Sequence, residues 1–150
     1  MFKYSGAFSL VELIVAMAIL GLLLAMATPG YVHQLNKGRR TDGHQLLLKM
    51  AAKQELYFMQ HHTFTDSISS PEGLNISDLS EQGHYRVSVE MCEARALSEC
   101  FELVASARGL QKQNDLPCAK LFLTSAGEKY ALNSDNAISS GRGVEGRCWG

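Results

Sequence analysis

One long apolar run near the N-terminus limits what this chain can fold into. From Phe8 to Thr28 the sequence has 21 residues, and Glu12 is the only charged one among them. A helix of this length spans about 32 Å, which is enough to cross a bilayer, and it would be apolar on every face. A chain of 150 residues rarely encloses such a helix on all sides, which argues against a buried helix of a soluble domain.

The residues before the run distinguish a retained membrane helix from a removable signal. Residues 1–7 form a short leader whose positive groups are Lys3 and the amino terminus. A secretory signal peptide has an apolar region of about 7–15 residues, followed by a cleavage site of small residues. Because this run is longer and has an acid near its start, the sequence favours a retained membrane helix over residues 8–28.

Glu12 is the most informative residue of the run. A charged side chain at the centre of a membrane helix costs about 2.5–3.5 kcal/mol, and it costs less near an end. Such a residue is a functional candidate that needs a partner, although a carboxylate that reaches the interface would also explain it. A suitable partner would be a positive group at the same depth, such as the free α-amine of a neighbouring copy.

The sequence around this acid resembles the N-terminus of type IV pilins of the type IVa class. The resemblance lies in the apolar helix and in two flanking stretches, GAFSLVE at residues 6–12 and ATPGY at residues 27–31. It implies that a prepilin peptidase cuts between Ala7 and Phe8 and that the new N-terminus at Phe8 is methylated. It also implies that Glu12 pairs with the terminal amine of an adjacent subunit, and it makes Pro29 a second residue of assembly. The family usually has Gly directly before the cut, whereas Gly6 here lies one position earlier.

The resemblance also implies where the protein is found and what it contacts. It puts a single-pass helix in the inner membrane with the C-terminal part in the periplasm, and then in an extracellular pilus after assembly. The implied partners are other pilin subunits, prepilin peptidase and the inner-membrane pilus assembly machinery. The positive-inside rule alone favours the opposite orientation, because Lys37, Arg39 and Arg40 follow the helix. The four cysteines agree with an exported C-terminal part.

Hydrophobic spacing predicts an α+β chain after the membrane segment. Helical spacing continues through residues 29–62 in an amphipathic second half, with a weak point at Pro29-Gly30. A polar connecting loop follows at residues 63–84, with a short helical turn at 76–79. Period-two alternation then predicts strands, and a Gly- and Ser-rich loop after them. The strands are expected at residues 85–91, 101–107, 119–124 and 129–132, and the loop at 133–146. The resemblance implies a type IV pilin fold, in which the long helix packs on an antiparallel sheet within residues 85–150.

Four cysteines allow three disulfide pairings. They are Cys92, Cys100, Cys118 and Cys148. Their spacing contains no close metal-binding pair, so disulfides are expected rather than zinc. If Cys92 faces Cys100 in a hairpin, opposed residue numbers sum to 192, and each inward apolar residue meets another apolar one. Glu90 then faces Glu102, which is mildly unfavourable. We predict Cys92–Cys100 from this register, which leaves Cys118–Cys148.

The C-terminal bridge resembles the disulfide-closed loop of type IV pilins, and nearby residues resemble PilE-like minor pilins. These residues are DLPC at 115–118, GEK at 127–129 and the terminal Cys148-Trp149. The resemblance implies a structural, minor subunit of the type IV pilus that polymerises through its N-terminal helix. The alternatives are a type II secretion system pseudopilin, or a pilin that acts as a receptor for DNA or a surface ligand.

The charge balance does not support a nucleic-acid partner. The net charge is -1 and the pI is near 6.5, whereas a dedicated nucleic-acid binder usually has a basic excess. A local patch at Lys129, Arg142 and Arg147 is conceivable, but scattered solvated charge explains these residues more simply.

The sequence contains no motif that predicts an enzyme, a cofactor or a metal site. It has no Gly-rich phosphate loop and no nucleophile elbow. His61 and His62 are adjacent, so they point apart, and no acid cluster accompanies them. The Asn-Ser-Asp-Asn loop at residues 133–136 offers one acid, which is few for calcium. We expect no catalytic residue and assign the remaining histidines to the polar surface: His33, His44 and His84.

Overall fold

The computed structural model describes residues 9–92, 95–140 and 147–149. The chain divides into two compact units, Met1–Leu35 and Asn36–Gly150, and each is described by itself. Several predictions lie outside the described residues: the leader with Gly6 and Ala7, the methylated Phe8, and Arg142.

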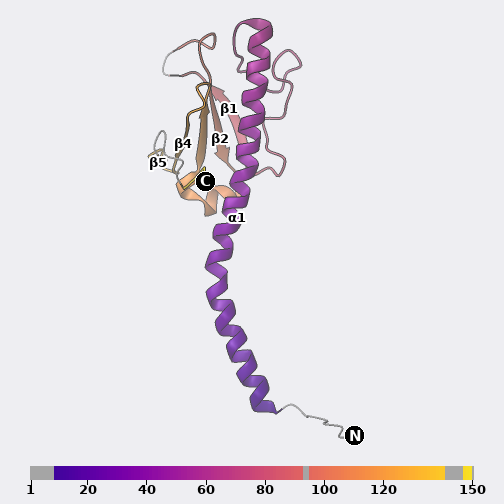
Figure 1. The fold of residues 1–150 in the computed structure, drawn as a ribbon, viewed down its shortest axis with the longest axis vertical. Helices are drawn as coiled ribbons and strands as arrows, with labels where there is room; N and C mark the ends of the chain where they lie inside the picture. Colours follow the sequence, from indigo (N-terminus) through magenta and orange to yellow (C-terminus); the bar gives the residue numbers. More distant parts are fainter. Residues whose placement is uncertain (1–8, 93–94, 141–146, 150) are drawn as a thin grey trace. The chain divides into compact units, whose positions relative to one another are not determined.

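The first unit contains the start of α1 (Leu10–His61), the helix coloured from indigo to magenta in Figure 1. Its large apolar side chains are exposed from Leu10 to Leu24, and Glu12 lies in the first turn. Among the described residues, no single straight helix is long and apolar enough to cross a membrane. The segments Leu10–Ala25 and Gly30–His61 meet that requirement together, as a bent pair, by length and composition. The membrane span at residues 8–28 therefore stays a prediction.

The helix extends as far as the sequence predicts. Positions 29 and 30 both lie within α1, so Pro29 does not end the helix. The helix ends at His61, and His62 follows with a φ of 55°, the left-handed conformation that commonly ends a helix.

The second unit contains an antiparallel sheet that lies alongside α1 (Figure 1). Within the described residues it has five strands in the order β1-β2-β3-β4-β5. They are β1 (Tyr85–Glu90), β2 (Glu102–Ala107), β3 (Lys120–Thr124), β4 (Lys129–Leu132) and β5 (Ile138–Ser140). The predicted register of the first hairpin is confirmed, because Tyr85 lies opposite Ala107 and Val87 lies opposite Ala105. The register also puts Glu90 opposite Glu102, as expected.

Two local predictions are wrong, and two short elements were missed. The tail after β4 is not all loop, because β5 pairs with β4 through Leu132 and Ile138. The segment 76–79 is not a helical turn: Leu79 forms a β-bridge with Arg86, and the Ser77 hydroxyl bonds to the backbone of Leu79 instead. Two short elements between β2 and β3 were not predicted, α2 (Gly109–Asn114) and the 3-10 turn η1 (Leu116–Cys118).

The core lies between α1 and the face of the sheet formed by odd-numbered residues. Leu46, Leu47 and Met50 supply the helix side of this core. The sheet side is supplied by inward residues of the first four strands: Tyr85, Val87, Leu103, Ala105, Leu121, Leu123 and Ala131. The even-numbered residues of the same strands therefore belong to the opposite, outer face of the sheet.

Candidate functional site

Both disulfides lie in the second unit and join the cysteines that the sequence analysis paired. The Cα atoms are 6.1 Å apart in Cys92–Cys100 and 5.6 Å apart in Cys118–Cys148. Cys118 and Cys148 are fully buried, so this bridge fixes the end of the chain inside the domain. The loop that it closes contains β3, β4 and β5.

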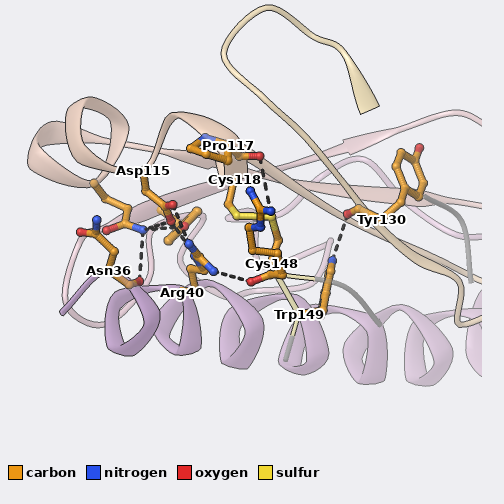
Figure 2. The surroundings of a disulfide bond; sticks show 11 residues. Asn36, Arg40, Asp115, Pro117, Cys118, Tyr130, Cys148 and Trp149 are labelled. Atoms are coloured by element: carbon orange, nitrogen blue, oxygen red, sulfur yellow. Dashed lines mark hydrogen bonds and ion pairs between the residues drawn. A yellow bond between two sulfur atoms is a disulfide. The ribbon is translucent and has the colours of Figure 1, made fainter. Parts of the chain in front are cut away.

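A buried ion pair joins α1 to this disulfide-closed region (Figure 2). The Arg40 guanidinium donates from Nε to Asp115 Oδ2 at 2.6 Å and from Nη2 to Asp115 Oδ1 at 2.7 Å. Its Nη1 donates to the carbonyl oxygen of Arg147 at 2.6 Å. Because both side chains are at least 95% buried, the two charges neutralise one another away from water. Arg40 therefore holds α2 and the C-terminal tail against α1.

Gln111 extends this network into the core. Its amide nitrogen lies within hydrogen-bond distance of Asp115 Oδ2 at 2.7 Å, Tyr85 Oη at 3.1 Å and the Asn36 carbonyl at 3.3 Å. The Asn36 amide in turn donates to the carbonyl of Asn114. Burial raises the pKa of Tyr85 to about 12, although the hydrogen bond from Gln111 acts to lower this pKa. The Tyr85 hydroxyl therefore stays protonated. The network orients α2, a helix of six residues.

Trp149 packs on α1 immediately after the disulfide. Its ring stacks on His44 with centroids 4.3 Å apart and planes 7° apart, and its Nε1 donates to the carbonyl oxygen of Tyr130 at 3.0 Å (Figure 2 labels Trp149 and Tyr130). The Lys129 ammonium lies 5.4 Å from the centre of the Trp149 ring, within the range of a cation–π contact. This contact places a cation beside the C-terminal tail.

The histidine assignments were partly wrong. His33 is exposed, as predicted, but His44 is part of the Trp149 stack. Burial lowers the pKa of His44 to about 4, with help from the nearby charges of Arg40 and Lys129, so the ring is neutral at physiological pH. His84 lies against Asp42, with its Nδ1 3.2 Å from the carboxylate. The partners of His44 and His84 are far away in the sequence, so the residues around each histidine did not indicate its contact.

Asp42 organises the start of β1. Its carboxylate accepts hydrogen bonds from the Ser80 hydroxyl at 2.6 Å and from the backbone N–H groups of Gln82 and His84. Burial raises the pKa of Asp42, but these hydrogen bonds outweigh it and leave the pKa below its ordinary value. The carboxylate is therefore charged and serves the local fold.

The residues described by the structure show no arrangement that would hold a metal. No group of three or more His, Cys, Asp or Glu in these ranges is placed to bind one. In the loop at residues 133–136, the Asn133 side chain accepts from the backbone of Asp135 and Ala137, and Asn136 accepts from Lys120. The side-chain oxygens of Asn133 and Asn136 therefore accept hydrogen bonds from the protein itself.

The small net charge conceals an uneven distribution. Residues 55–102 contain nine Asp and Glu against two Lys and Arg, whereas residues 103–150 contain six Lys and Arg against four Asp and Glu. One of those four acids, Asp115, is already paired with Arg40. Lys129 is half-buried and lies over the Trp149 ring. Arg147 is exposed and precedes Trp149 by two residues in the sequence. This asymmetry is visible in the sequence, where the net charge of -1 hides it.

A long N-terminal helix packed on an antiparallel sheet, with a tail closed by a disulfide, defines the type IV pilin class. Residues 2–28 match the model for the prokaryotic N-terminal methylation motif. Residues 29–122 match the family described as type IV minor pilin ComP, DNA uptake sequence receptor. Because this second match covers more than half of the chain, the chain belongs to that family and is a minor type IV pilin. A search of the curated proteins found no match.

Proposed function

We propose that this minor pilin binds DNA on the surface of a type IV pilus. The observation that carries the proposal is the match over residues 29–122 to a family described as a DNA uptake sequence receptor. The basic excess after residue 103 supports it, because phosphate neutralisation by Lys and Arg supplies most of the affinity of non-specific DNA binding.

Lys129 and Arg147 are the residues we assign to DNA contact at the C-terminal tail. Lys129 is positioned over Trp149, and the carbonyl of Arg147 is fixed by Arg40. Fixing the backbone lowers the entropy lost when the Arg147 side chain binds a phosphate. Arg40 is not assigned to DNA contact, because its charge is buried and paired with that of Asp115.

Fluorescence anisotropy of a labelled DNA duplex tests this proposal, with the full chain kept in a non-ionic detergent. We expect binding that weakens with salt, and a salt slope that falls by about 0.9 for each phosphate contact removed by Lys129→Gln or Arg147→Gln. Lys53→Gln, an exposed residue of α1, removes the same charge elsewhere and should leave the slope unchanged. Absence of duplex binding by the wild type at low salt would refute the proposal.

We further propose that the N-terminus is processed and assembled as in other type IV pilins. The match to the N-terminal methylation motif supports a cut between Ala7 and Phe8 and methylation of Phe8. The apolar surface of α1 supports storage in the inner membrane before assembly into an extracellular filament, where Glu12 pairs with the amine of a neighbouring subunit. Intact-mass measurement tests this: the expected chain lacks residues 1–7 and gains one methyl group, and a chain that begins at Met1 would contradict it.

The match to a pilus family favours assembly into a pilus over the alternative of a secretion pseudopilin.

A further inference from the structure

A hollow on the outer face of the sheet contains none of the described tail residues, 147–149, in its lining. It has a volume of about 550 Å³ and lies over β1 and β2 at the edge of the sheet. Two arginines and two serines contribute polar groups to its lining: Arg86, Ser88, Ser106 and Arg108. The strand register places them in one row on the same face: Arg86 lies directly opposite Ser106, and because the strands are antiparallel, Ser88 and Arg108 lie on opposite sides of this pair.

These four side chains carry N–H and O–H groups that can donate hydrogen bonds to a ligand. The Arg86 guanidinium lies beside Asp78, with its Nε 3.1 Å from the carboxylate, and both side chains are exposed. The side chain of Arg108 has no hydrogen-bond or ion-pair partner among the described residues. Its backbone N–H donates to the carbonyl oxygen of His84.

The donors suit an oxyanion that carries several acceptor oxygens. A guanidinium offers a fork of N–H groups that matches a phosphate, and a hydroxyl adds a single donor beside it. Asp66 and Asp78 also line the hollow. Their charges oppose an anion, so the site is weak for a free ion and depends on other contacts made by a larger ligand.

We propose that the outer-face hollow formed by Arg86, Arg108, Ser88 and Ser106 binds a backbone phosphodiester of DNA. This inference rests on the proposed function and adds a second contact, on the face of the sheet opposite the core. Arg108 makes the principal contact because no ion pair with a described residue occupies its charge, and Arg86 supports it.

The test compares four variants by duplex anisotropy against salt, using the full chain in non-ionic detergent. Arg108→Gln and Arg86→Gln should each weaken binding and lower the salt slope by about 0.9. Arg95→Gln is the matched control, because Arg95 is exposed and lines a different hollow, together with Glu99 and Glu128. Asp66→Asn should tighten binding, a gain that damage to the fold cannot produce. Circular dichroism and thiol counting confirm that each variant is folded with both disulfides intact.

The outcomes separate this site from the proposed function. Equal salt slopes for Arg108→Gln, Arg86→Gln and Arg95→Gln, with wild-type binding intact, would overturn the site and leave the function standing. Absence of DNA binding by the wild type would overturn both. Inorganic phosphate and vesicles of anionic lipid are the comparison probes. Binding of either that depends on the two arginines, while DNA binding does not, would overturn the assignment to DNA.

Discussion

The substitution Asp115→Asn tests whether the buried ion pair holds the C-terminal tail in place. Asp115 accepts two hydrogen bonds from Arg40 and one from Gln111, and its side chain is 3% exposed. The amide keeps the shape of the carboxylate but turns one acceptor into a donor and removes the negative charge. The Arg40 guanidinium, 5% exposed, then stays buried without a counter-charge.

Removing one partner of such a pair typically costs about 3–5 kcal/mol in the free energy of unfolding. For a unit of this size the midpoint of thermal unfolding should fall by roughly 10–20 °C. The loss follows from an unpaired charge rather than from a missing contact. The double variant Arg40→Met with Asp115→Leu should therefore recover most of the stability, because neither buried charge remains.

Urea unfolding of the full chain in detergent, followed by Trp149 fluorescence, measures the effect, since Trp149 is the single tryptophan. Trp149 also lies next to the network, through the Arg147 carbonyl. A loss below about 1 kcal/mol for Asp115→Asn, or a double variant less stable than the single one, would show that this pair does not secure the tail.

Three further predictions concern the core, pH and assembly. A Cβ at Gly43 would lie 2.8 Å from the Tyr85 ring, so Gly43→Ala should cost about 1–3 kcal/mol in urea unfolding, whereas Gly38→Ala, which meets nothing within 4 Å, should not destabilise. Since the pKa of His44 falls from 6.5 to about 4 on folding, the unfolded chain binds the extra proton between these values, and stability should drop as pH is lowered from 6.5 to 4. His44→Phe should flatten that profile; an unchanged profile would exclude His44 as its source. Glu12→Ala should leave membrane insertion intact but reduce incorporation into sheared filaments on immunoblots, and equal incorporation would contradict its assembly role.

Sequence patterns predicted the elements whose signals are local. The first hairpin was predictable residue by residue, because a shift of one position would have turned Val87 and Val89 away from the core. The Cys92–Cys100 bridge followed from the same register. The length of α1 was predictable as well, since apolar residues recur at helical spacing on both sides of Pro29.

The missed features depend on partners far away in the sequence. Arg40 and Asp115 are 75 residues apart, so neither neighbourhood shows that the other is its counter-charge. The helix α2 is too short and polar to have a recognisable periodicity, and it is fixed by one buried glutamine, Gln111. A net charge is a poor guide for a different reason: it averages over segments of opposite sign, here residues 55–102 and 103–150.

The Cys118–Cys148 bridge also determines how the second unit responds to mechanical load. A pull on Asn36 and on the C-terminal tail passes from Cys118 directly to Cys148, so the loop between them carries no tension. Those 30 residues would otherwise add about 100 Å of extended chain, at ~3.4 Å per residue. A second unit pulled at its two ends therefore stays shorter by that amount while the disulfide is intact. Because β3, β4 and β5 lie inside the shielded loop, stretching the chain ends cannot draw them out one by one.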